Sequence, residues 1–277
     1  MKKILFPTDF SKTANNAFIY ALKMAKYIEA ELIVLHVYEL PIVSYEGYSS
    51  YISEVYETIE LSKFENFKDY IPELRKIAEE NKLEDVKMSH VMEEGDLILA
   101  IKKMVKQEKI SLIIMGTKGA SGLKEVFVGT NAGALIKKVP ITTLIVPAKA
   151  KFEPIKTIGF TTRFRSKDRT ALKQVLGFAK MMDAKVKCLY VKTFDSEVKE
   201  SRINKWRDDF KKEPVKFFVI PNEDVKQTIF DFMNSQNIDM MAMLTYKRHF
   251  LEGLFDQSLT KKLSYHSEIP LFALHEK

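Results

Sequence analysis

The first 150 residues alternate between short apolar runs and longer stretches in which apolar positions recur every three or four residues. Short apolar runs are typical of buried strands, and the longer period is typical of amphipathic helices. Five strands are predicted, at residues 3–6, 31–37, 86–91, 112–115 and 141–146. Four helices are predicted between them: one after Ser11, a long charged one that ends near Asn81, and two at residues 96–106 and 130–138. This alternation predicts a doubly wound α/β domain with parallel strands.

Two local features qualify this pattern. Pro7 is expected to end the first strand because it lacks a backbone N–H, and either Ser11 or Asp9 is expected to cap the next helix. Residues 41–56 are rich in tyrosine and serine, so we expect an irregular segment that leads into the long helix. Amphipathic packing is the favoured role for this segment, and a lid or a partner-contact surface are the alternatives.

The second half of the chain repeats the first. A shift of 154 residues aligns Ile4 with Ile158 and Thr8 with Thr162, and a shift of 128 aligns Met115 with Met243. The difference means that 26 residues are missing from the second copy, and we expect them to be missing from the tyrosine-rich connection and its helix. Two domains are therefore predicted, at residues 1–150 and 151–277.

Composition is that of an ordinary globular protein, with 46% hydrophobic and 29% charged residues. No apolar run has the length of a transmembrane helix, and the apolar stretch at the N-terminus is too short for a signal peptide. Cys188 is the only cysteine, which excludes an intrachain disulfide and a cysteine-rich metal site. A cytoplasmic location without membrane contact is expected.

The net charge of +7 is unevenly distributed. Residues 1–150 hold 20 basic and 20 acidic side chains, so 24 basic and 17 acidic side chains fall in residues 151–277. A basic half can indicate a polyanionic partner, but no nucleic-acid motif accompanies the charge. A solvated lysine-rich surface is favoured over nucleic-acid binding.

A glycine-rich loop follows the predicted strand at 112–115. Four of the ten glycines, Gly116, Gly119, Gly122 and Gly129, fall within fourteen residues, just before the predicted helix at 130–138. Glycine allows backbone N–H groups to come close to a ligand, and a helix N-terminus favours an anion. The loop is therefore a candidate phosphate site.

The combination of this loop with the opening strand resembles a known family. The strand is followed by G-x2-G-x9-G-[S/T], and the opening strand ends in Pro7-Thr8-Asp9. These two pieces are similar to the universal stress protein family in its tandem form, and the similarity covers essentially all 277 residues. It implies two tandem doubly wound domains of the adenine nucleotide alpha hydrolase-like fold, each a five-stranded parallel sheet with strand order 3-2-1-4-5.

The resemblance implies a site for ATP or another adenine nucleotide in the first half. Asp9 would accept hydrogen bonds from the ribose hydroxyls, with Pro7 and Thr8 beside the base. Val37 would contact adenine, and Met115 would line the pocket. The phosphates would lie against the loop and the next helix, through Gly116, Thr117, Lys118, Gly119, Gly129, Thr130 and Asn131. Taken singly, Asp9 is equally well explained as a helix cap and the glycines as turn residues.

The second half departs from the motif at the same positions. Asp9 corresponds to Arg163 and Gly116 to Leu244, while Gly119, Gly129 and Thr130 correspond to Lys247, Asp256 and Gln257. We therefore expect no nucleotide binding of the family's kind in the second half. The cations Arg163, Arg165, Lys167 and Arg169 are typical of an exposed loop, although a different anion could bind them.

No catalytic motif is present. The sequence lacks G-x-x-x-x-G-K-[S/T] and G-x-S-x-G, and its five histidines are scattered without metal-ligand spacing. These absences favour a regulatory nucleotide-binding protein over an efficient enzyme. Slow ATP hydrolysis with Mg²⁺ and a purely structural or partner-binding module are the alternatives. The resemblance also implies an intrachain pseudo-dimer along the fifth strands, at residues 141–146 and 270–274, with a homodimer as a further option.

Overall fold

The computed structural model describes residues 2–40, 49–117, 130–245 and 269–275. Their contacts divide the chain into two compact units, one that extends to Met115 and one that begins at Gly116. The domain boundary predicted between residues 150 and 151 differs from this division and stays a prediction.

The first unit is built on a parallel sheet with the strand order β3-β2-β1-β4. Helices α1 and α2 contact each other, and α3 contacts β1 and β2. Right-handed crossovers place α3 on the face opposite to α1 and α2. The elements are β1 (Lys2–Thr8), α1 (Lys12–Tyr27), β2 (Ala30–Tyr38), α2 (Ser49–Glu80), β3 (Met88–Glu94), α3 (Leu97–Glu108) and β4 (Leu112–Gly116).

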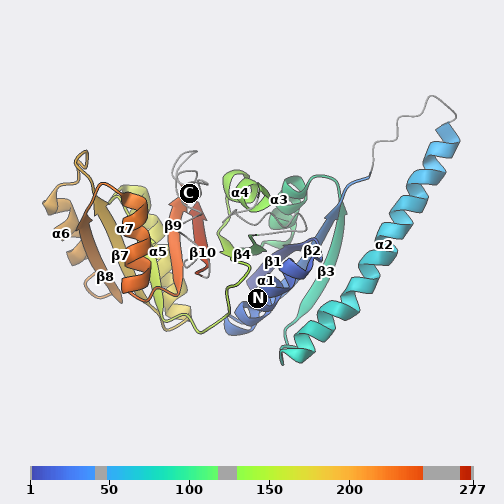
Figure 1. Cartoon of the computed structure of the whole chain (residues 1–277), viewed down its shortest axis with the longest axis horizontal. Coiled ribbons are helices and arrows are strands. Elements are labelled where there is room, and N and C mark those ends of the chain that lie inside the picture. Colours follow the sequence, from blue (N-terminus) through green and yellow to red (C-terminus); the bar gives the residue numbers. More distant parts are fainter. Residues whose placement is uncertain (1, 41–48, 118–129, 246–268, 276–277) are drawn as a thin grey trace. The chain divides into compact units, whose positions relative to one another are not determined.

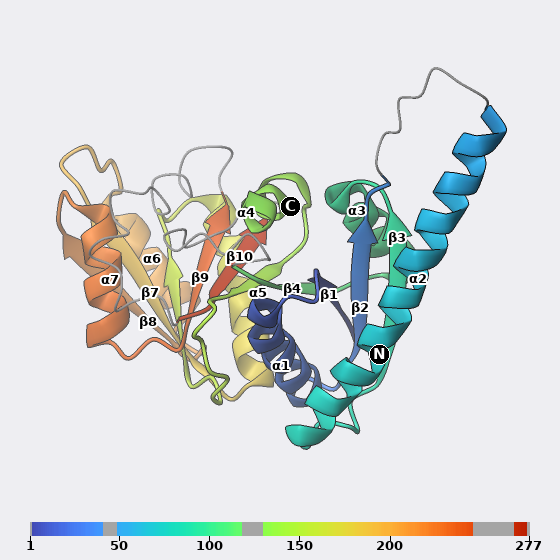
Figure 2. The ribbon, with the colours of Figure 1, turned by 45° about the vertical axis from the view of Figure 1, so that its right-hand side comes forward.

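Two predictions about this unit are wrong at their boundaries. Strand β1 continues through Pro7 to Thr8, in register with Leu35 and His36 of β2, because the φ angle of proline suits an extended backbone. Helix α2 already begins at Ser49, inside the segment predicted to be irregular. Figures 1 and 2 show α2 running alongside β3, with its first turns extending past the end of that strand. Residues 41–48 lie outside the described residues.

The second unit contains a mixed sheet with the order β5-β10-β9-β6-β7-β8. Every pair in it is parallel except β5 with β10, in which Leu144 faces Phe272 in an antiparallel register. Its elements are α4 (Thr130–Lys138), β5 (Thr143–Val146), β6 (Thr157–Thr161), α5 (Ser166–Met181), β7 (Lys185–Lys192), α6 (Glu200–Asp209), β8 (Val215–Pro221), α7 (Val225–Ser235), β9 (Met240–Thr245) and β10 (Leu271–His275).

The order of strands β6 to β10 confirms the predicted topology for the second half. Numbered from β6, the order β8-β7-β6-β9-β10 is 3-2-1-4-5, and the first unit has the same order for its first four strands. Helix α6 has 10 residues where α2 has 32, so most of the residues missing from the second copy are missing from this helix. The five-stranded core is kept while the connection is shortened.

Backbone conformation repeats along with the strands. Non-glycine residues with a positive φ angle are uncommon. Six of the seven described here occupy equivalent positions of the two repeats and so form three pairs. Phe10 pairs with Phe164 and Glu29 with Asp183 at the shift of 154 residues, and the third pair has the shift of 128. That third pair is Lys109 and Asn237. The same tight turns therefore end the equivalent elements in both halves, as an internal duplication requires.

Two half-buried histidines make the stability of the protein depend on pH. The Nε2 atoms of His90 on β3 and His275 on β10 are buried without a hydrogen-bond partner. Burial lowers the pKa of both imidazoles below the ordinary 6.5, and for His90 the charge of Arg75 lowers the pKa further. The unfolded chain therefore binds more protons below about pH 6.5, so the free energy of unfolding falls as the pH falls through that value.

We expect the urea midpoint at pH 5.5 to be lower than that at pH 7.5, where both imidazoles are neutral in the folded and the unfolded chain. A variant with both His90→Gln and His275→Gln lacks these two titrating groups. Its urea midpoint is therefore expected to fall less between pH 7.5 and pH 5.5 than that of the unmodified chain. An equal loss in the variant and the unmodified chain would contradict this assignment.

Candidate functional site

The carboxyl ends of parallel strands in the first unit bring together five of the predicted site residues. Pro7 and Thr8 end β1 and Asp9 follows them, while Val37 lies next to the last residue of β2. Met115 lies next to the last residue of β4, which pairs with β1 through Ile4–Leu112 and Leu5–Ile113. Pro7 is buried, Thr8, Val37 and Met115 are half-buried, and Asp9 is exposed. Open α/β sheets bind ligands at this edge.

The turn after β1 holds Asp9 in a defined position. The hydroxyl of Thr8 accepts a hydrogen bond from the N–H of Phe10 at 3.0 Å, and Oδ1 of Asp9 accepts one from the N–H of Ser11 at 3.0 Å. Ser11 is the N-cap of α1, because its Oγ accepts from the N–H of Ala14 at 3.3 Å. Asp9 therefore does not cap the helix, and its carboxylate lies at the solvent edge of the sheet.

An aromatic cluster that the sequence reading missed lies beside Asp9. The ring of Phe10 stacks on that of Tyr70, with centroids 4.3 Å apart and an interplanar angle of 9°. Phe67 and His36 also face Phe10, at centroid distances of 6.0 and 4.8 Å. Nδ1 of His36 lies 3.0 Å from the carbonyl oxygen of Thr8, so this contact links β2 to the end of β1. The cluster is an aromatic wall built from the turn after β1, from β2 and from α2.

The described part of the glycine loop belongs to the second unit. Gly116 is half-buried, Thr117 is buried, and the N–H of Thr117 donates to the carbonyl oxygen of Val146 at 3.0 Å. That N–H is committed within the protein, and the contact of Thr117 with the phosphates stays a prediction. Helix α4 begins at Thr130 as predicted, and both Thr130 and Asn131 are exposed in its first turn. The predicted site residues Lys118, Gly119 and Gly129 lie outside the described residues.

The equivalent edge of the second half has a different chemistry. Thr162 and Phe164 repeat the turn of the first half, with a hydrogen bond of 2.8 Å from the N–H of Phe164 to Oγ1 of Thr162. Arg163 takes the place of Asp9, and Leu244, which is 2% exposed in β9, takes the place of Gly116. Lys247, Asp256 and Gln257 lie outside the described residues.

Asp168 caps this second turn from inside the protein. Its side chain is fully buried, and its Oδ2 accepts hydrogen bonds from the hydroxyl of Thr162 and from the N–H groups of Arg163 and Arg165, at 3.0, 2.6 and 3.2 Å. Arg165 is the N-cap of α5, where the first half has Ser11, and Asp168 stands where the first half has Ala14. The backbone N–H groups of Arg163 and Arg165, just before α5, are therefore satisfied by the protein itself.

The described part of the chain offers neither a metal-binding cluster nor a membrane-spanning helix. No group of three histidine, cysteine, aspartate or glutamate side chains there is arranged to hold a metal ion. No helix in the same residues combines the length and apolar character needed to cross a membrane. The thiol of Cys188 is buried, and burial together with the charge of Asp168 raises its pKa well above the usual range. This cysteine is therefore poorly suited to act as a nucleophile.

Comparisons with known proteins show the family of this chain. The model of the universal stress protein family matches residues 1–147. Two universal stress proteins of Methanocaldococcus jannaschii are 31% identical over 153 residues and 35% identical over 163 residues. These alignments cover 54% and 53% of this chain, and 84% and 96% of the two relatives.

The fold similarity extends further than the sequence similarity. The crystal structure of a universal stress protein from Archaeoglobus fulgidus DSM 4304 matches with a TM-score of 0.70 at 17% identity, covering 99% of this chain and 96% of that one. At this level of identity the match shows the fold alone. The family model, by contrast, matches the sequence itself over more than half of the chain. The chain belongs to the universal stress protein family.

Proposed function

We propose that the first half of the chain binds ATP or a related adenine nucleotide and acts as a regulatory protein in a stress response. The observation that carries this proposal is the position of Asp9, an exposed carboxylate at the carboxyl end of the central strand β1, beside an aromatic wall. Carboxylates at this edge can accept hydrogen bonds from both ribose hydroxyls, and aromatic rings can lie against a base.

Each described residue has a distinct role in the proposed site. Asp9 holds the ribose, and Pro7 and Thr8 form the floor beside the base. Val37, half-buried near the end of β2, contacts adenine, and Met115 lines the pocket at the end of β4. The membership of the family supports these roles, and the strand register supports their placement on one edge.

The phosphates are assigned to the loop that begins at Gly116. Glycine at the end of β4 leaves the backbone accessible to an anion, and the exposed first turn of α4 offers Thr130 and Asn131. Lys118, Gly119 and Gly129 complete the proposed loop in sequence. A Mg²⁺ ion that travels with the phosphates needs few protein ligands, because it keeps several waters and binds phosphate oxygens directly.

Titration calorimetry with ATP, ADP, AMP and GTP tests the proposal. We expect an adenine nucleotide to bind, and Asp9→Ala to weaken its binding about tenfold or more, because hydrogen bonds to a charged acceptor are lost. Asp85→Ala is the matched control, since this exposed carboxylate pairs with Lys26 in a surface ion pair of little energetic value. The proposal would be overturned if none of the four nucleotides bound, or if Asp9→Ala bound the nucleotide as tightly as the unmodified chain.

The same protein separates nucleotide binding from the alternative, slow ATP hydrolysis with Mg²⁺. ATP incubated with the protein and Mg²⁺ is expected to be recovered intact. Steady release of ADP that stops in Asp9→Asn would assign the slow hydrolase instead.

We also propose that the second half serves as the packing partner of the first in an intrachain pseudo-dimer, with the repeat boundary between residues 150 and 151. The antiparallel pairing of β5 with β10 supports this, since these are the predicted fifth strands of the two repeats. Phe272 of β10 is buried and stacks on Phe178 of α5 at 4.6 Å, which makes this strand part of the core. Pairing through the equivalent strand of a second chain is the corresponding route to a homodimer.

A further inference from the structure

The second half contains a pocket of about 450 Å³ at the carboxyl ends of β6 and β7. We propose that this pocket binds a phosphate monoester of a small, largely apolar molecule. The pocket lies within the second unit and uses none of the residues assigned to the adenine nucleotide, so this ligand is additional to the proposed function. Its volume is in the range of small-molecule sites.

The inner wall of the pocket is apolar. Leu189 and Tyr190 of β7 and Ile229 of α7 line it, and all three are buried. Val191 and Val225 line it as well and are half-buried. A hydrophobic body that enters this wall displaces water from apolar surface, which is favourable in proportion to the area covered.

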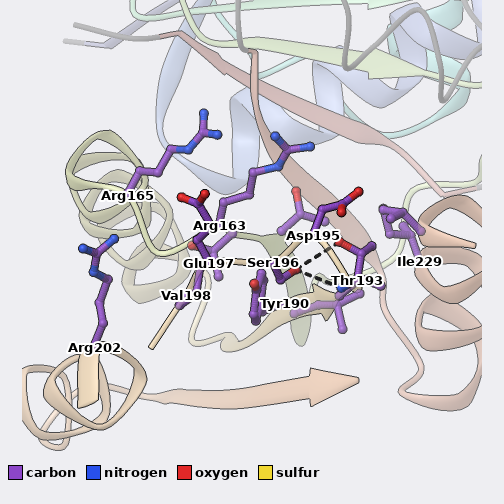
Figure 3. Close-up of a pocket in the computed structure, with 15 residues that line it drawn as sticks. Arg163, Arg165, Tyr190, Thr193, Asp195, Ser196, Glu197, Val198, Arg202 and Ile229 are labelled. Atoms are coloured by element: carbon purple, nitrogen blue, oxygen red, sulfur yellow. Dashed lines mark hydrogen bonds between the residues drawn. The ribbon is translucent and has the colours of Figure 1, made fainter. Parts of the chain in front are cut away.

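Three arginines from two elements line the same pocket. Arg163 and Arg165 come from the turn between β6 and α5, and Arg202 comes from α6. Figure 3 shows the side chain of Arg202 rising from its helix toward that of Arg165. Asp195 and Glu197 also line the pocket, so the charged side chains among its described lining residues carry one net positive charge. Guanidinium groups bind phosphate oxygens through pairs of parallel hydrogen bonds.

A second, more open hollow of about 720 Å³ adjoins the first, because Arg165 and Arg202 line both. Among the residues that the structure describes, its other charged lining residues are Lys167, Arg169 and Lys205, and none of the described lining residues is acidic. Arg169 is paired with Asp209, and the positive charges of this lining contribute to the electrostatic field at the mouth of the pocket. This field favours a phosphate dianion over a singly charged carboxylate.

The turn after β6 is equivalent to the turn that holds Asp9 in the first half, and its residues explain why the ligand differs from a nucleotide. Arg163 is a donor where Asp9 is an acceptor, so it matches an anion and not a ribose hydroxyl. Asp168 already occupies the backbone N–H groups of Arg163 and Arg165, so the phosphate must be held by side chains. Thr193 and Ser196, which hydrogen-bond to each other at 3.1 Å, shape the wall across from the arginines.

The fluorescence of Trp206 offers a direct readout of binding. This residue is the only tryptophan of the chain, is 4% exposed, and lines the second hollow next to the two shared arginines. Three probes separate the two parts of the ligand: phenyl phosphate, inorganic phosphate, and benzyl alcohol. A fourth probe, benzoate, replaces the dianion with a carboxylate.

We expect phenyl phosphate to change the emission saturably and to bind at least about tenfold more tightly than any other probe, with an affinity that falls as NaCl is raised. Arg163→Gln and Arg202→Gln each remove an exposed side chain and are expected to weaken binding about tenfold. Arg207→Gln is the matched control, because Arg207 lies on the same helix but bonds Glu200 and Asn204 and lines neither hollow.

Circular dichroism confirms that each variant is folded before its affinity is measured. Absence of a saturable change with phenyl phosphate, equal affinity for inorganic phosphate or benzoate, or full affinity in both pocket variants would overturn the proposal. None of these outcomes bears on ATP binding by the first half, which is measured by calorimetry with Asp9→Ala.

Discussion

Gly116→Leu is expected to reduce the affinity for ATP about a hundredfold or more while leaving the fold intact. Gly116 is the last residue of β4 and the first of the glycine loop, so a leucine side chain there fills the space through which a phosphate approaches the backbone. The second half indicates that the fold tolerates leucine at this position, because Leu244 is buried at the equivalent position of β9.

Calorimetric titration with ATP measures this effect. Gly177→Ala is the matched control: Gly177 lies in α5 with no atom near the position of an added Cβ, so this substitution is expected to leave ATP affinity unchanged. A Gly116→Leu protein that is folded and binds ATP as tightly as the unmodified chain would show that the phosphates lie elsewhere.

Asp168→Ala is expected to lower the free energy of unfolding by about 3 kcal/mol, because three donors lose their acceptor at once. The donors are the hydroxyl of Thr162 and the N–H groups of Arg163 and Arg165. Alanine is the natural residue at the equivalent position of the first half, but there Ser11 caps the helix and no replacement for Asp168 is needed.

Urea unfolding at neutral pH, followed by Trp206 fluorescence, measures this loss. Asp208→Ala on α6 is the control, since Asp208 is exposed and its removal is expected to change stability by no more than about 0.5 kcal/mol. A loss in Asp168→Ala as small as that of the control would mean that the turn satisfies its donors in another way.

Much of this fold follows from local sequence patterns. The apolar periodicity that predicts a helix after Ser11 and another at residues 96–106 is a local signal, and α1 and α3 lie where this signal places them. The duplication was visible in the sequence because strands β6 to β9 keep the apolar positions of the first half. Boundaries were less accurate: Pro7 was expected to end β1, whereas pairing with β2 extends the strand to Thr8.

The parts of the candidate site that depend on tertiary contacts could not be read from sequence. The stacking of Phe10 on Tyr70 joins the turn after β1 to α2, and only the spacing of Phe67 and Tyr70 on one face of α2 indicated it. The hydrogen bond from Thr117 to Val146 likewise depends on how two distant segments pack. Residue type predicted which groups could bind a ligand, but packing decided which of them remain available.

Native mass spectrometry of the intact chain with ATP tests most directly whether one of the two repeats binds nucleotide. The account predicts a mass increase equal to one nucleotide per chain at saturation, and none for Gly116→Leu. Two nucleotides per chain would contradict the loss of the motif around Arg163 and Leu244, and the absence of any bound nucleotide would contradict the assignment of Asp9 and Gly116.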